Sequence, residues 1–297
     1  MLMVGPPGAG KTMISERMAT ILPPLTKKEQ LEVSKIYSVC GLLADSRTLL
    51  QERPFRSPHH TVSMAGLAGG GRSIRPGEIS LAHHGVLFLD ELPEFKRSVL
   101  EVLRQPMEER RVTISRAKVS VDYPASFMLI ASMNPCPCGF YNHPDKECVC
   151  GPGVVKRYLN RISGPLLDRI DLHVEVTPVS VQELSNYNTK SEHSSAIVQR
   201  VIKARSIQED RYKNNDGIYC NAQMTSKMLA EVCALTDSGV TLLRNAMERL
   251  QLSARAHDRI LKVARTAADL DGSEHIENHH LAEAINYRSL DREGWAG

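Results

Sequence analysis

The sequence predicts an α/β domain built on a parallel sheet, followed by an all-helical domain. Three observations support this prediction: short apolar runs that end on polar residues, a glycine-rich loop directly after the first run, and a change to helical periodicity beyond Val181. Continuous apolar runs are typical of strands buried on both faces of a parallel sheet. We expect residues 1–185 to form the α/β domain and residues 194–297, after a polar linker, to form the helical one.

The composition is that of a globular protein. Of the 297 residues 42% are hydrophobic, which excludes an intrinsically disordered chain. The net charge of +3 is too small to predict nucleic-acid binding by itself, so local basic clusters must carry that argument. No apolar run approaches the ~20 residues of a membrane helix, so no membrane partner is expected. Exposed-looking cysteines and the lack of a visible signal peptide predict a reducing, cytoplasmic location.

The first strand leads into a phosphate loop. The loop matches the pattern G-x-x-x-x-G-K-[ST] at every fixed position, and its residues are Gly5, Pro6, Pro7, Gly8, Ala9, Gly10, Lys11 and Thr12. The apolar residues before it predict the end of a buried strand, and residues 13–19 predict the first turns of a helix. Backbone N–H groups and the helix N-terminus would hold the phosphates of ATP or GTP. Lys11 would reach the β- and γ-phosphates, and the Thr12 hydroxyl would bind Mg²⁺.

A second apolar run ends in two acids. Gly85–Leu89 predicts a buried strand, and Asp90 and Glu91 follow at its carboxyl end, where open α/β sheets bind ligands. Asp90 would hold the Mg²⁺ through water, and Glu91 would orient and deprotonate the attacking water. The alternative is that these acids form the N-cap of a helix.

A third apolar run, Phe127–Met133, ends on Asn134. At the tip of a neighbouring strand, this amide would lie between the two acids and touch the γ-phosphate or the water. The alternative is a turn-forming asparagine before Pro135.

This ordered set of motifs resembles the Walker A, Walker B and sensor-1 elements of an AAA+ ATPase. Pro165–Leu172 resembles the segment of replicative MCM helicases that carries the arginine finger, and Leu252–Arg255 opens a helix similar to the sensor-2 helix of that clade. The resemblance implies that Arg169 reaches the nucleotide of a neighbouring subunit and that Arg255 reaches the nucleotide from its own lid. The alternatives are a surface ion pair for Arg169 and a solvated arginine on an amphipathic helix for Arg255.

Three further segments narrow the resemblance to the magnesium-chelatase-like ComM/YifB family. This resemblance covers essentially the whole chain. They are Arg56–Thr61, Arg75–Gly85 and Ser163–Arg169. Members of that family carry an N-terminal Lon-protease-like domain and a longer lead into the phosphate loop. Only four residues precede the loop here, so we expect a preceding region to be missing from this sequence.

Four of the seven cysteines lie in one short segment, residues 136–151, which we call the cysteine loop. Two C-x-C pairs joined by a short spacer can arrange four thiolates tetrahedrally around Zn²⁺. We expect structural zinc, because the ligands would all be thiolates: Cys136, Cys138, Cys148 and Cys150. A reducible disulfide pair, unliganded thiols and an iron–sulfur cluster remain alternatives.

Residues 110–121 alternate in polarity and predict a β-hairpin with a basic tip, which follows a helix over residues 98–109. In the MCM and chelatase clade a hairpin at this position lines the central pore. Arg116 and Lys118 would then contact DNA phosphates, with an ordinary surface hairpin as the alternative. The glycine-rich stretch over residues 62–75 is interpreted as a flexible insertion. The histidine pairs at 59–60 and 83–84 lack metal-binding spacing and are interpreted as parts of polar networks.

The region after the linker contains five helical patterns punctuated by Asp-Ser, Leu-Ser and Asp-Gly. Their ranges are Ser194–Tyr212, Ser226–Leu235, Ser238–Leu250, Ala254–Leu270 and Asn278–Tyr287. We interpret them as an all-helical lid that closes on the nucleotide.

Together the motifs predict an ATPase with Mg²⁺ as its cofactor that works as a homo-oligomeric ring, expected to be hexameric. An arginine finger needs the nucleotide of a partner, and this is the reason to expect a ring. The resemblance implies DNA as the substrate, in branch migration or helicase action during recombination or natural transformation. Two alternatives stay open: the ATPase subunit of a magnesium chelatase, and a protein-remodelling or binding fragment that does not hydrolyse ATP.

Overall fold

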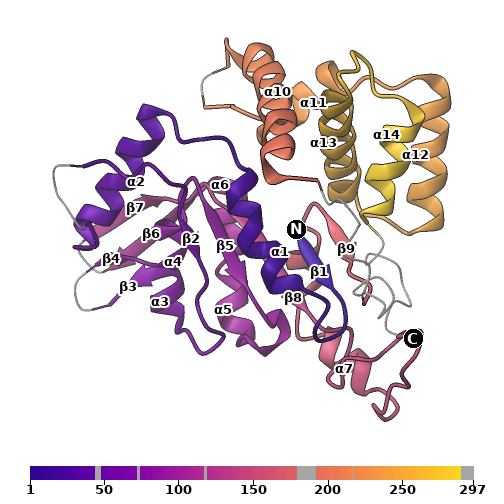
Figure 1. Ribbon diagram of the computed structural model, residues 1–297, viewed down its shortest axis with the longest axis horizontal. Helices are drawn as coiled ribbons and strands as arrows, with labels where there is room; N and C mark the ends of the chain where they lie inside the picture. Colours follow the sequence, from indigo (N-terminus) through magenta and orange to yellow (C-terminus); the bar gives the residue numbers. More distant parts are fainter. Residues whose placement is uncertain (44–47, 72–73, 117–118, 179–191, 216, 289–297) are drawn as a thin grey trace. The chain divides into compact units, whose positions relative to one another are not determined.

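The computed structural model describes residues 1–43, 48–71, 74–116, 119–178, 192–215 and 217–288, without the side chains of Arg116 and Val119 (Figure 1). The chain forms two compact units. The first comprises Met1–Arg169 with Glu175–Asn186, and the second comprises Ile170–Val174 with Tyr187–Gly297. A short stretch before the linker therefore belongs to the second unit.

The first unit alternates strands and helices, and the last strand begins in the short stretch that belongs to the second unit. In chain order they are β1 (Leu2–Val4), α1 (Lys11–Met18), α2 (Lys27–Val39), β2 (Phe55–Arg56), α3 (Met64–Ala68), β3 (Gly69–Gly70), β4 (Arg75–Pro76), α4 (Glu78–Leu81), β5 (Val86–Leu89), α5 (Arg97–Glu101), α6 (Arg104–Glu109), β6 (Arg111–Arg116), β7 (Val119–Pro124), β8 (Met128–Met133), α7 (Val154–Leu159), α8 (Gly164–Leu167) and β9 (His173–Glu175).

The predicted parallel sheet is confirmed. Its strand order is β2-β5-β8-β1-β9, and β8 pairs in parallel with both β1 and β5. The central strands are buried, as their continuous apolar sequences require. The phosphate loop, the two acids and Asn134 follow β1, β5 and β8, so three polar segments leave the sheet along one edge.

Two parts of the first unit differ from the sequence prediction. The single helix expected over residues 98–109 is broken into α5 and α6 around Val102 and Leu103. Pro106 explains the break, because it lacks the N–H that a continuous helix would need and is tolerated in the first turn of α6. The stretch interpreted as a flexible insertion instead contains α3 and the two-stranded ladder β3–β4.

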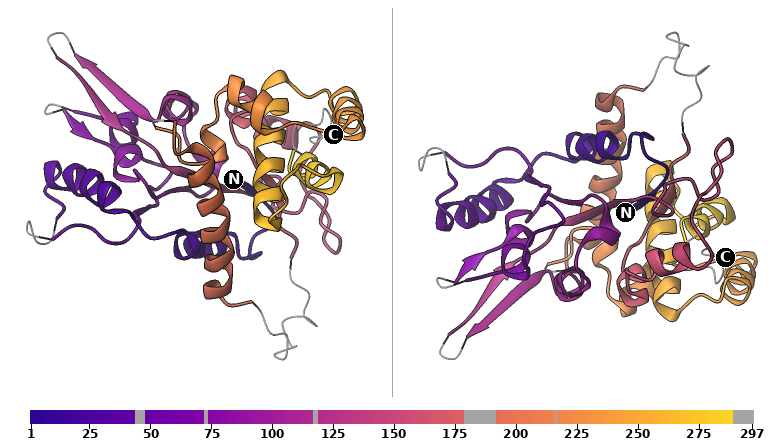
Figure 2. Two further views of the ribbon diagram at one scale, coloured as in Figure 1. Left: turned by 90° about the horizontal axis from the view of Figure 1, so that it is seen from above. Right: turned by 90° about the horizontal axis from the view of Figure 1, so that it is seen from below.

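The predicted hairpin is formed by β6 and β7. The two strands pair antiparallel from Arg111 opposite Pro124 to Arg116 opposite Val119. Figure 2 shows this ribbon as an arm that extends from the first unit. Thr113 and Ser115 bond across it to Asp122 and Ser120, so its exposed face is polar.

The second unit is helical, as predicted. Its helices are α10 (Ser194–Tyr212), α11 (Ser226–Val232), α12 (Asp237–Arg249), α13 (Ala254–Asp271) and α14 (Asn278–Asn286). Hydroxyl N-caps start three of them: the side chains of Thr225, Thr236 and Ser253 each accept a backbone N–H from the first turn. The central helix, α13, packs against α10, α11 and α14, and its apolar face supplies the core. Within the residues described, every helix is too short or too polar to cross a bilayer.

A buried carboxylate ties the second unit together. The Asp269 side chain is fully buried and accepts two hydrogen bonds from Arg211, at 2.8 and 2.6 Å, and one each from Asn221 and Arg265, at 2.7 and 3.1 Å. Burial acts to raise the pKa of Asp269, but the donors outweigh it and the pKa is lowered. The network joins α10 to α13 through a carboxylate that is fully buried and a guanidinium, that of Arg211, that is mostly buried.

We expect Asp269→Ala to lower the free energy of unfolding of the second unit by about 3–5 kcal/mol, because it leaves buried guanidinium groups uncompensated. Urea denaturation followed by circular dichroism measures this. The control is Asp210→Ala, at an exposed position of α10, for which a change within about 0.5 kcal/mol is expected. Equal stability of the two variants would contradict the role given to Asp269.

Candidate functional site

The phosphate loop lies between the end of β1 and the start of α1. Gly10, at the N-cap of α1, has φ 82°, a conformation that favours glycine. A Cβ at Gly5 would lie 2.3 Å from the carbonyl oxygen of Val176, so only glycine fits there. The N–H group of Gly5 donates to the carbonyl oxygen of Met133 at 3.2 Å, which attaches the loop to the end of β8. The loop then leads into a helix N-terminus, the arrangement that binds phosphate.

Lys11 spans the loop. Its ammonium donates to the carbonyl oxygens of Gly5 and Pro6 at 2.7 and 2.8 Å, and to Asn134 Oδ1 at 3.1 Å. Burial lowers the pKa of Lys11, and the nearby Asp90 acts against that shift. The structure therefore brings the predicted phosphate-binding lysine and the predicted asparagine into direct contact.

Asp90 completes the same site. Its carboxylate accepts a hydrogen bond from the Thr12 hydroxyl at 3.0 Å, a short one from the Ser132 hydroxyl, and one from the backbone N–H of Glu91 at 3.0 Å. A hydroxyl and a carboxylate in contact are oxygen ligands of the kind that Mg²⁺ prefers. The donor set of Thr12 and Asp90 thus fits the metal expected from the sequence.

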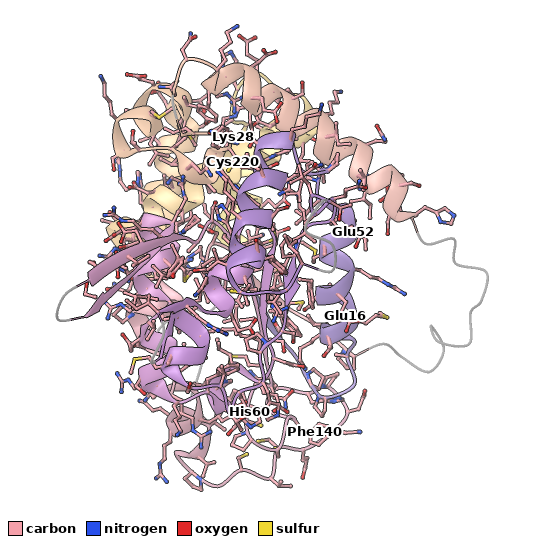
Figure 3. All side chains as sticks on the ribbon, turned by 90° about the vertical axis from the view of Figure 1, so that its left-hand side faces the viewer. Glu16, Lys28, Glu52, His60, Phe140 and Cys220 are labelled. Carbon is pink, nitrogen blue, oxygen red and sulfur yellow. The ribbon has the colours of Figure 1, made fainter. Side chains whose placement is uncertain are left out.

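Glu91 is held in an unusual backbone conformation. Its φ is 53°, in the left-handed region, and its side chain is 60% exposed. Its neighbour is His60, labelled in Figure 3, whose Nδ1 lies 3.5 Å from a Glu91 carboxylate oxygen. The carboxylate is therefore accessible at the edge of the sheet while its backbone is fixed by the turn that follows β5.

Two residues of this site were missed by the sequence prediction. Ser132 was included in an apolar strand, although a lone hydroxyl two positions before Asn134 must lie on the same face of β8. His60 was interpreted only as part of a polar network. It follows β2 by four residues, and nothing in its local pattern indicates that β2 pairs with β5 and so brings it to Glu91.

Arg169 is buried within the first unit. Its side chain is 5% exposed, donates to the carbonyl oxygen of Pro165 at 2.6 Å and pairs with Glu108 at 2.8 Å. It is therefore neither the exposed surface pair nor an outward-pointing side chain. A finger role remains a prediction and would require the guanidinium to exchange Glu108 for a nucleotide.

The remaining sequence-predicted contacts are not tested by the geometry of this site. Arg255 is exposed in the first turn of α13, in the second unit, and its sensor role stays a prediction. Arg116 ends β6, but its side chain and the whole of Lys118 lie outside the described residues.

The four clustered cysteines converge. Cys136 Sγ lies 3.2 Å from Cys138 Sγ and 3.7 Å from Cys148 Sγ, the last two sulfurs are 3.6 Å apart, and Cys150 lies within the same group. None of the four forms a disulfide. A tetrahedral ion with bonds of about 2.3 Å separates its sulfurs by a little under 4 Å, so the donor set fits Zn²⁺.

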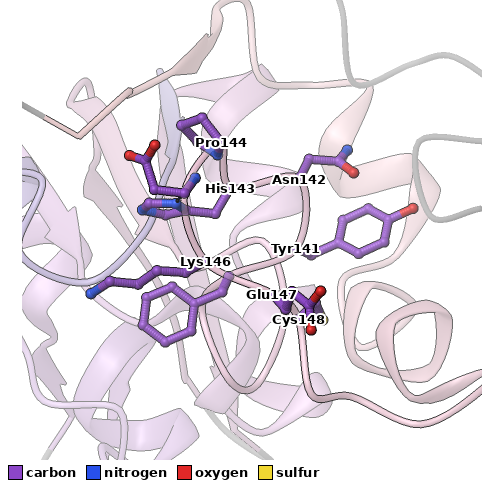
Figure 4. Close-up of a pocket in the computed structure, with 9 residues that line it drawn as sticks. Tyr141, Asn142, His143, Pro144, Lys146, Glu147 and Cys148 are labelled. Carbon is purple, nitrogen blue, oxygen red and sulfur yellow. Dashed lines mark hydrogen bonds between the residues drawn. The ribbon is translucent and has the colours of Figure 1, made fainter.

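The surroundings of the cysteine loop favour a thiolate at Cys138, whereas the pKa values of Cys148 and Cys150 are raised. Burial acts to raise the pKa of the Cys138 thiol, but N–H groups of Phe140 and Val149 and the neighbouring Cys136 outweigh it, and the pKa falls to about 6. The spacer between the cysteine pairs surrounds an open hollow of about 400 Å³ (Figure 4). This hollow is lined by residues 140–148, and no residue of the phosphate loop lines it.

Two clusters of histidines with an acid form hydrogen-bond networks instead of metal sites. They are Glu32 with His83 and His84, and Asp271 with His279 and His280. His83 and His84 point their Nε2 atoms at Glu32, at 3.4 and 2.8 Å. His83 Nδ1 accepts the N–H of Ser126, so its Nε2 carries the proton and has no lone pair for a metal. Burial lowers the pKa of His83 to about 4, which keeps the ring neutral. His280 is restricted in the same way, because its Nδ1 accepts the N–H of Glu277.

Comparison with known proteins agrees with the geometry. Residues 1–184 match the family model of magnesium chelatase, subunit ChlI, and residues 191–288 match that of its C-terminal part. YifB of Salmonella typhimurium is 44% identical over 293 residues, and the competence protein ComM of Haemophilus influenzae is 45% identical over 292 residues. Each match covers 98% of this chain and 56% of the relative.

A shorter match reaches the chelatases themselves. The magnesium-chelatase 67 kDa subunit of Chlorobaculum parvum is 33% identical over 116 residues, which cover 39% of this chain and 15% of the relative. With the phosphate loop, the two acids and Asn134 assembled at one edge of the sheet, these matches show that the chain belongs to the magnesium chelatase subunit ChlI family of AAA+ proteins, and within it is similar to ComM and YifB.

Proposed function

We propose that this chain hydrolyses ATP and is the motor module of a ring-forming protein that moves DNA. The observation that carries the ATPase part is the meeting of four side chains from three neighbouring segments: Lys11 with Asn134, and Thr12 with Asp90. Each is of the type that phosphoryl transfer needs, because its catalysis is mostly positioning and charge neutralisation.

The residues divide the reaction between them. The loop N–H groups bind the phosphates, and Lys11 exchanges the carbonyl oxygens of Gly5 and Pro6 for phosphate oxygens. Thr12 and Asp90 would hold Mg²⁺, which would neutralise phosphate charge when bound. Glu91 takes the proton from the attacking water while the bond between the γ-phosphorus and the leaving ADP oxygen breaks. Asn134 holds the water or the γ-phosphate in line.

Assembly as a ring rests on the finger role that the resemblance implies for Arg169, which is paired with Glu108 of its own unit in this structure. Its partner Glu108 lies at the end of α6, immediately before the hairpin β6–β7. If Arg169 leaves Glu108 to reach a neighbouring nucleotide, α6 loses a buried contact at the base of the arm. Nucleotide binding in one subunit would thereby be coupled to the hairpin of the next.

DNA is proposed as the polymer that the hairpin contacts. The hairpin carries Arg111 and Arg116 on β6 and Lys118 near its tip, and such contacts would bind phosphates without reading sequence. The similarity to a competence protein supports recombination or natural transformation as the setting. A second candidate is the ATPase subunit of a magnesium chelatase, favoured by the shorter match to the 67 kDa subunits.

The cysteine loop is proposed to hold structural zinc. Four thiol ligands fill a tetrahedral shell and leave no open position for a reaction. The spacing of the sulfurs supports this assignment over a disulfide.

We expect Glu91→Gln to bind ATP with unchanged affinity but to lower kcat by about 10²–10⁴, because it removes the base and keeps the shape. Lys11→Ala is expected to lose binding itself. Phosphate release and titration with a fluorescent ATP analogue separate the two effects, and Glu52→Gln, at an exposed position, is the control. Normal turnover by Glu91→Gln would show that Glu91 is not the base.

We expect four-way or forked DNA to stimulate the ATPase and to bind in a salt-dependent manner. Arg116→Ala combined with Lys118→Ala should reduce that stimulation severalfold and make the salt dependence shallower, because two phosphate contacts are lost. The double variant Lys213→Ala/Lys227→Ala removes the same charge from the second unit and serves as the control. Stimulation by a porphyrin with Mg²⁺, and none by DNA, would favour the chelatase instead.

Purified protein is expected to contain one equivalent of zinc, measured by mass spectrometry of the metal. Cys148→Ser should lose it, since three thiolates bind the ion much more weakly than four. The isolated Cys233, which is buried in the second unit, provides the matched control as Cys233→Ser. Less than about half an equivalent in the unaltered protein would refute structural zinc.

A further inference from the structure

The segment that leads into the cysteine loop, residues 133–135, lies against the phosphate loop. Two contacts join them before the first cysteine: the N–H of Gly5 donates to Met133, and Lys11 donates to Asn134. Only Pro135 separates Asn134 from Cys136. The cysteine loop therefore begins two residues after Asn134, next to a segment that already touches the phosphate loop.

A third contact follows inside the cysteine loop. Gly139 has φ +85°, and a Cβ added there would lie 2.6 Å from Cδ and 3.2 Å from Cγ of Pro7. The backbone of Gly139 thus lies directly against the ring of Pro7. A proline ring has little freedom to move aside, because it is closed onto its own backbone.

The sulfurs determine where Gly139 lies. Gly139 follows Cys138 directly, and its N–H donates to the carbonyl oxygen of Cys136 at 3.0 Å. Cys136 is fully buried, and the sulfurs of Cys136 and Cys138 meet those of the second pair. A metal ion would lock this turn by binding all four sulfurs, whereas without it only weak sulfur–sulfur hydrogen bonds join Cys136, Cys138 and Cys148.

We propose that the metal held by the cysteine loop sets the position of Pro7 through Gly139, and thereby the affinity of the phosphate loop for MgATP. Gly139 is then a positioning residue of the nucleotide site, although it touches neither nucleotide nor metal. The inference rests on the proposed ATPase function and on the zinc assignment, and it gives the zinc a consequence beyond holding its own loop.

The contact predicts a specific pair of variants. Gly139→Ala should keep its zinc but weaken the binding of a fluorescent ATP analogue at least about fivefold, because the added methyl group must displace Pro7. Gly153→Ala is the matched control: Gly153 lies just beyond the last cysteine with a similar φ of +74°, but a Cβ there meets nothing within 4 Å. It carries the same backbone strain without the contact, so its affinity should stay within about twofold of the unaltered protein.

A double-variant cycle isolates the contact. Pro7→Ala removes the ring that the methyl group of Gly139→Ala would strike, so the effects of the two substitutions should be less than additive. Removal of zinc by a chelator under reducing conditions should weaken nucleotide binding by a similar factor, and readdition of Zn²⁺ should restore it. Circular dichroism would verify that the metal-free protein stays folded.

Different outcomes test the coupling through Gly139 and the proposed ATPase function separately. If the zinc-loaded protein binds the ATP analogue but Gly139→Ala and the metal-free protein bind it equally well, the coupling is refuted and the ATPase proposal stands. If the zinc-loaded protein binds no nucleotide, the proposed function fails, and the inference fails with it. Additive effects of Pro7→Ala and Gly139→Ala would also overturn the coupling, because the two residues would then act independently.

Discussion

The parallel pairing of β8 with both β1 and β5 is the constraint on which the candidate site depends. Because parallel strands end at the same edge of a sheet, this pairing brings residues 78 and 123 positions apart into hydrogen-bonding distance. Lys11 meets Asn134 and Thr12 meets Asp90 only because the register aligns Leu2 with Ala131 and Leu89 with that same residue. A slip by one residue would turn these side chains to the other face of the sheet.

The sequence was sufficient for everything that repeats or follows a fixed pattern. The glycines and lysine of the phosphate loop, the apolar strands that end on polar tips and the helical periods of the second unit all have local physical causes. The contacts of single side chains across the sheet have no local cause that the sequence pattern could reveal. Ser132 and His60 reach the acids through strand pairing, and Arg169 is buried against Glu108 by packing that no pattern around residue 169 reveals.

To bind a nucleotide, the site must exchange hydrogen bonds that its cationic side chains already make. Lys11 and Arg169 are both already bound by groups of their own unit: carbonyl oxygens and Asn134 for the first, Pro165 and Glu108 for the second. The net binding free energy that a nucleotide gains from each of these side chains is only the difference between the new contact and the contact that is lost. Losing the partner of a buried charge is costly, so such exchanges are expected to occur together with binding and not before it.

The left-handed backbone conformation of Glu91 has a consequence for attempts to stabilise this protein. A side chain in the left-handed region is unfavourable by about 1 kcal/mol, a cost that glycine avoids. A search for more stable variants would therefore select glycine or asparagine at this position and discard the carboxylate. Stability screens on this fold would improve the folded protein by removing the residue that we propose makes it an enzyme.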